Sequence, residues 1–81
     1  MMKVFIGGLP PDVEELDLVG FVSTYAEVST VKVVRDRVTK KCKGYAFLQM
    51  SSDKMAERAV EELNGRRYKG NTLSVNISPD K

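Results

Sequence analysis

The chain has 81 residues, of which 42% are hydrophobic and 30% charged, and its formal net charge is +2. This length and composition predict a single small globular domain over residues 1–81, with a core of about residues 3–78. One cysteine and no histidine argue against an internal disulfide, a cysteine-rich metal site and the commonest general base.

The first predicted strand covers residues 3–7. Val4 and Ile6 alternate there with Lys3 and Phe5, and this period of two places the two pairs on opposite faces. Prolines follow at positions 10 and 11, and proline lacks the N–H that a continuing strand needs for its ladder. We therefore expect the strand to end before them.

A helix is predicted to begin after Asp12, acting as its cap, and to run to about residue 25. Its apolar stripe follows the spacing i, i+3, i+4 and i+7 and consists of Leu18, Phe21, Val22 and Tyr25. Off this stripe lie Leu16 and Val19, in an acidic segment. They give the helix an alternative role as a docking surface for a protein partner.

A β-branched strand is predicted over residues 28–34, with Val31 and Val33 facing inward and Lys32 outward. A basic loop follows at residues 36–42. Between residues 32 and 43, six cations and one carboxylate give a local charge of +5, whereas residues 12–27 hold five carboxylates and no cation, or −5. This separation of charge predicts an oriented field across the molecule.

The most informative strand is predicted over residues 43–50. One of its faces carries Ala46, Leu48 and Met50, and the other carries Lys43, Tyr45, Phe47 and Gln49. A strand face that only packs against a core would not place a lysine and a glutamine in line with two aromatic rings. Such a face suits a charged partner with flat rings, and single-stranded nucleic acid is the obvious one.

The rest of the chain predicts a second helix and a last strand. Ser51 or Ser52 is the expected cap, and Asn64 with Gly65 the expected end of the helix. The apolar face of this helix consists of Met55, Ala56, Ala59, Val60 and Leu63. A turn is predicted around Gly70, and the last strand covers residues 73–78, where Leu73, Val75 and Ile77 alternate with Ser74, Asn76 and Ser78.

The element order βαββαβ predicts an α+β, ferredoxin-like fold, in which two helices pack on one face of a four-stranded antiparallel sheet. No third element remains for the other face. Phe5, Tyr45 and Phe47 should then lie in solvent on that face, and an exposed aromatic patch usually marks a binding site.

Two segments resemble the signatures of the RNA-recognition motif family. Lys43–Met50 resembles its octamer, basic-Gly-aromatic-small-aromatic-aliphatic-x-aromatic, and Val4–Leu9 resembles its hexamer. Met50 stands where the octamer has an aromatic residue, and we expect it to face the core. The chain is similar to the small single-domain bacterial or plant glycine-rich RNA-binding type, without the glycine-rich tail.

The resemblance implies a role for each matching residue. Phe5 and Tyr45 would each stack a base, Phe47 would lie against a ribose, and Lys43 would bind a phosphate. The remaining implied RNA contacts are Lys3, Lys32, Gln49 and Asn76 on the same face. A mobile cationic loop would hold the RNA strand through Arg35, Arg37, Lys40 and Lys41.

The expected function is therefore a non-enzymatic module that binds single-stranded RNA. The alternatives are single-stranded DNA and a protein partner at the first helix, with a small enzyme of the same architecture a distant third. We expect no cofactor, metal, small-molecule substrate or membrane contact. A monomeric, cytoplasmic (intracellular) protein of post-transcriptional regulation is predicted, which is either a stand-alone protein or an excised domain.

Overall fold

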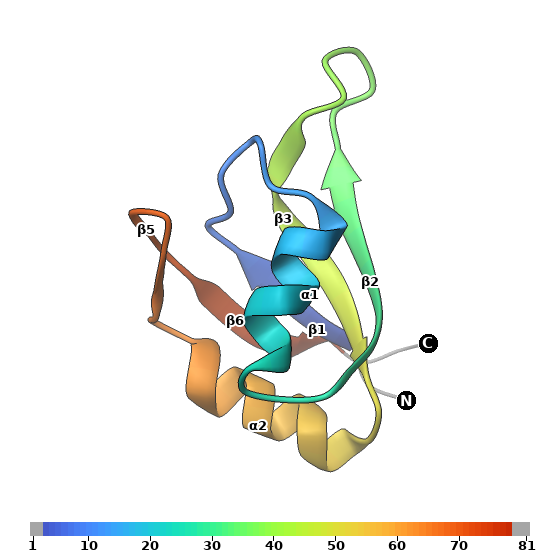
Figure 1. The fold of residues 1–81 in the computed structure, drawn as a ribbon, viewed down its shortest axis with the longest axis vertical. Coiled ribbons are helices and arrows are strands. Elements are labelled where there is room, and N and C mark those ends of the chain that lie inside the picture. The colour runs from blue at the N-terminus through green and yellow to red at the C-terminus, as the bar shows by residue number, and fades with distance from the viewer. Residues whose placement is uncertain (1–2, 79–81) are drawn as a thin grey trace.

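The computed structural model describes residues 3–78 (Figure 1). In chain order its elements are β1 (Lys3–Gly7), α1 (Glu15–Ser23), β2 (Val28–Arg35), β3 (Cys42–Met50), α2 (Asp53–Leu63), β4 (Arg67–Tyr68), β5 (Asn71–Thr72) and β6 (Ser74–Ser78). The predicted ferredoxin-like order is confirmed, with one addition: β4 and β5 pair as a small hairpin between α2 and the last strand.

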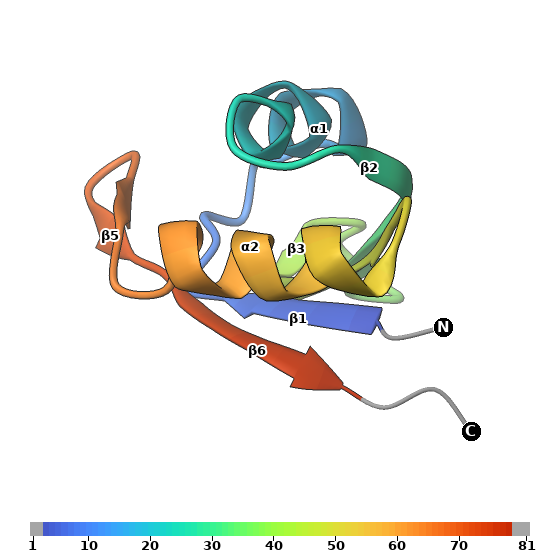
Figure 2. The same cartoon turned by 90° about the horizontal axis from the view of Figure 1, so that it is seen from below.

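The main sheet has four antiparallel strands in the order β2-β3-β1-β6, so β1 and β3 are central. Both helices lie on one side of this sheet (Figure 2). The register places Phe5 between Phe47 on β3 and Asn76 on β6. β2 is an edge strand, and its pairing with β3 shifts register twice, between Val28 and Thr30 and between Val33 and Arg35. Such shifts mark bulges that bend and twist a strand.

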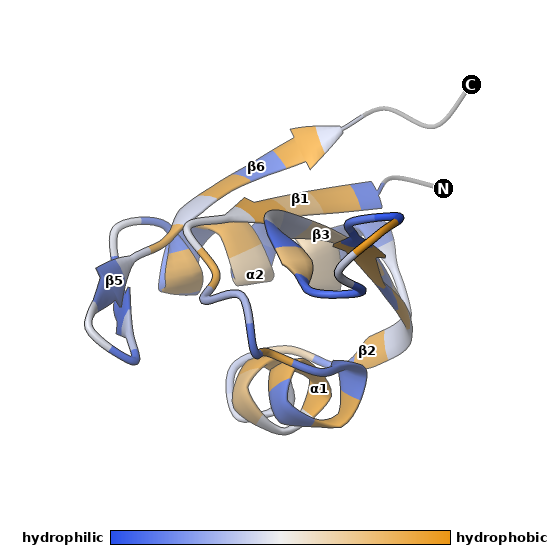
Figure 3. Cartoon of the chain, turned by 90° about the horizontal axis from the view of Figure 1, so that it is seen from above, coloured by the Kyte–Doolittle hydropathy of each residue, from blue (hydrophilic) through white to orange (hydrophobic). Residues whose placement is uncertain are grey.

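The core fills the space between the helices and the sheet. The strands contribute the alternate residues Val4, Ile6, Val33, Ala46, Leu48, Met50 and Val75, and the helices contribute Leu18, Val22, Ala56, Ala59 and Leu63, all buried. The expectation that Met50 faces the core is confirmed. The β4–β5 hairpin, in contrast, is largely hydrophilic (Figure 3). One face of the sheet is thus committed to packing.

The first helix begins later than predicted. Its cap is Glu14, whose backbone N–H donates to Asp17 Oδ2 at 3.2 Å. Asp12 is exposed and does not cap the helix, because Val13 between them is drawn into the core and its N–H donates to the Pro10 carbonyl. The helix also ends at Ser23 rather than near residue 25.

The loop between β2 and β3 is shorter than predicted and spans residues 36–41. Cys42, expected in the loop, is buried at the start of β3, where its sulfur accepts the Gly44 N–H at 3.3 Å. The Asp36 carboxylate closes the loop by accepting the N–H groups of Val38 and Thr39 at 2.8 and 2.9 Å. These hydrogen bonds, that of Thr39 first, hold the pKa of Asp36 below its ordinary value.

The second half follows the sequence prediction more closely. Ser52 caps α2 by accepting the Met55 N–H at 3.2 Å, and Gly65 follows the helix with a φ of +83°. The predicted turn around Gly70 joins β4 to β5, with positive φ at Lys69 and Gly70. In residues 3–78, neither helix has the length and apolar character that a membrane crossing requires.

Candidate nucleic-acid interface

Three aromatic rings lie together on the sheet surface opposite the helices, which we call the aromatic face. Phe5 and Phe47 are register partners on β1 and β3, and Tyr45 pairs with Gly7. The centroid of the Phe5 ring lies 5.7 Å from that of the Tyr45 ring and 5.8 Å from that of the Phe47 ring. The sequence predicted rings standing in solvent, but all three are half-buried, because they pack against one another.

Two glycines near these rings leave little space for a side chain. A Cβ on Gly7 would lie 3.2 Å from Cζ of Phe5, so the bare backbone lets the Phe5 ring lie over it. A Cβ on Gly8 would lie 2.4 Å from the Thr72 carbonyl oxygen, and Gly8 has a φ of +85°, which L side chains rarely adopt. Gly7 therefore shapes the aromatic face, and Gly8 allows the chain after β1 to approach the backbone of β5 closely.

Polar side chains surround the rings in the rows that the register defines. Lys32 pairs with Phe47 and Asn76 with Phe5, while Gln49 stands between Lys3 and Thr30. Beside Phe47, an open pocket of about 520 Å³ includes Lys3, Thr30, Lys32 and Gln49 in its lining. The structure thus places the predicted Lys3, Lys32, Gln49 and Asn76 in register with the aromatic residues or with each other.

Thr30 belongs to this site, although the sequence analysis did not name it. Its hydroxyl donates to Gln49 Oε1 at 3.1 Å across the β2–β3 pair. The alternation that put Lys32 outward also puts Thr30 outward, so the signal was present. It was missed because threonine is an ordinary strand residue.

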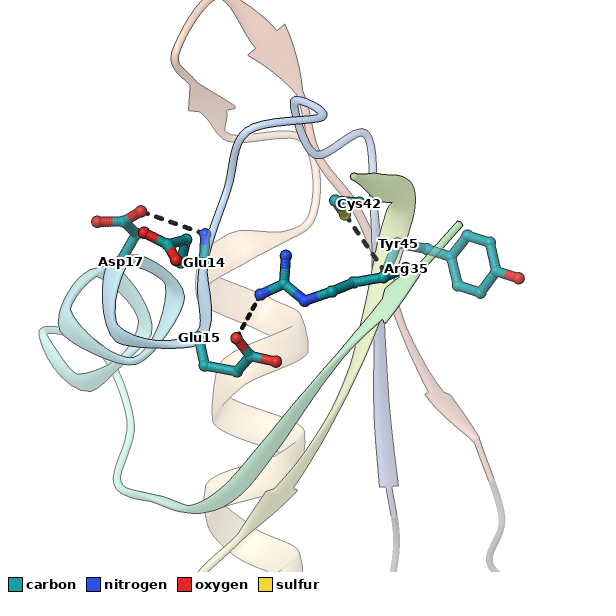
Figure 4. Close-up of polar contacts among 6 residues, drawn as sticks. All are labelled: Glu14, Glu15, Asp17, Arg35, Cys42 and Tyr45. Atoms are coloured by element: carbon teal, nitrogen blue, oxygen red, sulfur yellow. Dashed lines mark hydrogen bonds and ion pairs between the residues drawn. The ribbon is translucent and has the colours of Figure 1, made fainter. Parts of the chain in front are cut away.

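Arg35 lies apart from the other predicted contacts. It is the last residue of β2 rather than a loop residue, and its guanidinium forms an ion pair with Glu15 of α1 at 2.5 Å. Figure 4 shows Arg35 pointing toward Glu15, on the side of the sheet opposite the Tyr45 ring. The physical reason is the alternation along β2, since Arg35 stands two residues after the buried Val33 and therefore shares its face toward the helices.

The Arg35 contact also affects the carboxyl group of Glu15. Partial desolvation raises the pKa of Glu15, but the hydrogen bond from its own backbone N–H and the Arg35 guanidinium outweigh that effect, and the net pKa lies below the ordinary value. The predicted loop cations that remain are Arg37, Lys40 and Lys41, all exposed. Lys43 is exposed near the start of β3, two residues before Tyr45.

Two further features concern other functions. Leu16 is 86% exposed, and α1, the helix that carries it, lies on the side of the sheet away from the aromatic face (Figure 2). Within residues 3–78, no cluster of three or more aspartate, glutamate or cysteine side chains forms a candidate metal site.

A family model described as the RNA recognition motif matches residues 4–74. Heterogeneous nuclear ribonucleoprotein Q of Arabidopsis thaliana is 39% identical over 79 residues, which cover 98% of this chain and 16% of that protein. Among the curated relatives described, the chain spans between 16% and 37% of their length.

Solved structures give the same picture of the fold. The crystal structure of RNA binding protein PG1 matches with a TM-score of 0.90 at 32% identity, covering 100% of this chain and 98% of that one. The structure of the Rna15 RRM with bound RNA (GU) matches with a TM-score of 0.87 at 28% identity, and the match covers 96% of this chain and 83% of that one.

Proposed function

We infer that this chain, which belongs to the RNA recognition motif family, binds single-stranded RNA on its aromatic face. The observation that carries this inference is the group of Phe5, Tyr45 and Phe47, whose rings contact one another on the strand face opposite the buried core residues of β1 and β3. Both helices lie on the core side of the sheet (Figure 2). Aromatic rings on a sheet, bordered by lysines, are the means by which such modules hold unpaired bases.

Each part of the face has a distinct task in this proposal. The rings of Phe5 and Tyr45 stack one base each, and Phe47 lies against a ribose. Stacking is worth about 1–3 kcal/mol per base. Lys43 binds a phosphate, and Arg37, Lys40 and Lys41 at the loop add attraction at longer range. Arg35 takes no part, because Glu15 already pairs with its guanidinium on the opposite side.

The module acts by binding and not by catalysis, and we propose a role in post-transcriptional regulation in the cytoplasm. A single module of this kind engages a few nucleotides and acts as a monomer in this proposal. A protein partner at α1 is the second candidate, and the exposure of Leu16 favours it.

The test is fluorescence anisotropy with a short labelled RNA of random sequence. We expect the parent to bind, and Phe5→Ala and Tyr45→Ala each to weaken binding about tenfold or more. Leu16→Ala, on the helix side, is the matched control and should bind like the parent. Circular dichroism establishes that each variant is folded. Single-stranded DNA of the same sequence serves as a second ligand.

The outcome separates the two candidates. If the parent fails to bind at low salt, or binds equally after both aromatic substitutions, the aromatic face is not the site. The acidic α1 surface would then be the place to seek a partner, with Leu16→Ala as the informative variant.

A further inference from the structure

The pocket beside Phe47 differs in character from the three rings. It is formed where β1, β3 and β2 lie side by side, and Thr30, Lys32 and Gln49 border it with the Phe47 ring. A ring can stack any base, because every base has a π-face. Selection among bases requires hydrogen bonds to their edges, and this pocket holds the polar groups that can make them.

The orientation of the Gln49 amide is set by Thr30. The Thr30 hydroxyl donates to Gln49 Oε1 at 3.1 Å, and the two residues are register partners on adjacent strands. With its carbonyl oxygen engaged in this way, the amide has its NH₂ group left to offer a ligand. That group carries two N–H donors and no acceptor.

The neighbouring cation strengthens this bias toward donors. Lys32 is exposed beside Phe47, and its ammonium group can donate but cannot accept. Among these three polar side chains, the remaining acceptor capacity is confined to the lone pairs of Thr30 Oγ1 and the second lone pair of Gln49 Oε1, the two atoms joined by the hydrogen bond. A base edge that carries a carbonyl oxygen matches such a pocket, whereas an exocyclic amino group would place donor against donor.

We propose that the Thr30–Gln49 pocket selects a base with a carbonyl oxygen at C4 of a pyrimidine or C6 of a purine, uracil or guanine, over cytosine and adenine, which carry an amino group at that position. This proposal rests on the proposed function, because the base arrives as part of a strand held on the aromatic face. The hydrogen bond from Thr30 to Gln49 is the element that fixes the preference.

The first experiment compares oligouridylate with oligocytidylate, each of about six nucleotides. These two bases have the same ring shape and charge, and they differ only at the pairing edge: uracil has a C4 carbonyl and an N3–H, and cytosine has a C4 amino group and an unprotonated N3. We expect the parent to bind oligouridylate about threefold to tenfold more tightly, as one good edge contact provides. Single guanosine or adenosine substitutions in oligocytidylate form the purine arm and show whether the carbonyl base is uracil, guanine or either.

Three variants connect the preference to the proposed contact. Thr30→Val keeps the shape but frees the Gln49 amide to turn, so the preference should disappear while binding persists. Thr30→Ser retains the hydroxyl and should retain the preference. Gln49→Glu replaces donors by acceptors, so it should weaken binding to all strands and turn the preference toward cytosine.

The results distinguish failure of this inference from failure of the proposed function. Equal binding of carbonyl and amino bases by the parent, or a preference that survives in Thr30→Val, would overturn the inference and leave RNA binding on the rings intact. A parent that binds none of the strands would overturn both.

Discussion

At the scale of single residues, the bare backbone at Gly7 determines how the Phe5 ring lies. Phe5 and Gly7 are two residues apart on β1 and share a face, and a Cβ at Gly7 would lie within 3.2 Å of Phe5 Cζ. The ring would have to shift to accommodate it. A glycine in the middle of a binding strand is therefore part of the binding surface, although it has no side chain to offer.

Gly7→Ala should weaken RNA binding severalfold without lowering stability. The φ of Gly7 is not in the left-handed region, so alanine fits the strand backbone, and its smaller loss of chain entropy contributes about 0.4–1 kcal/mol of stability. Anisotropy and urea unfolding measure the two effects. Gly20→Ala in α1, where a Cβ meets nothing within 4 Å, is the control and should stabilise the protein without changing affinity. Unchanged binding in Gly7→Ala would show that the ring adapts freely.

Residue-level prediction from the sequence succeeded where simple alternation holds. Phe5 and Phe47 lie on one face and Val4 and Leu48 on the other, as a period of two requires. It failed at Arg35, which was assigned to the loop but is the last residue of β2, where the same alternation places it on the inward face of Val33, toward α1. Alternation alone does not show at which residue a strand ends.

At the scale of elements, the ion pair between Arg35 and Glu15 links the edge strand β2 to the start of α1. Its two side chains are 32% and 42% exposed, so solvent screens their attraction and the contribution to stability is about 0.2–1 kcal/mol. Because the pKa of Glu15 is lower in the folded protein, the pair stabilises the fold above the pKa of the unfolded chain. That contribution is lost as the pH falls through the folded pKa.

Glu15→Gln should therefore destabilise the protein at pH 7 but not in acid. At neutral pH the free energy of unfolding of the parent should exceed that of the variant by about 0.2–1 kcal/mol. The difference should shrink as the pH falls below 4.5, the ordinary pKa of a glutamate. Urea unfolding across this range provides the measurement, with exposed Glu57→Gln in α2 as the control. A difference that stays constant with pH would rule out an ionic origin.

The element order could be read from the sequence, but the start of α1 and the β4–β5 hairpin could not. Ser52 and Gly65 bracket α2 as their residue types predict, because caps act locally. The start of α1 depends instead on Val13 reaching the core, which is a tertiary effect. The two-residue strands β4 and β5 are too short to show any alternation.

At the scale of the whole molecule, charge is separated between the two sides of the sheet. Lys32 stands on the aromatic face, whereas Glu14 and Asp17 belong to the capped end of α1 on the helix side. The net charge of +2 conceals this arrangement. A polyanion approaching the protein is attracted to one side and repelled by the other, so the field favours the productive orientation.

Lys43→Gln should reduce the dependence of RNA binding on salt. Each phosphate neutralised on a single strand contributes about −0.7 to the slope of log affinity against log salt concentration, so losing one contact should make the slope shallower by about that amount. Anisotropy titrations at several salt concentrations give the slope. Lys54→Gln on α2 removes the same charge from the helix side, and there the slope should stay as in the parent. Equal changes in both variants would point to net charge rather than contact.

The twice-shifted register of β2 has a consequence for the protein in concentrated solution. β2 forms one edge of the sheet, and an edge strand offers unpaired backbone groups to any passing strand. Two irregularities in eight residues bend that edge, and Lys32 and Arg35 add charge to it, which together make a poor template for fibril growth. The irregular pairing of β2 with β3 thus also protects this edge of the sheet against aggregation.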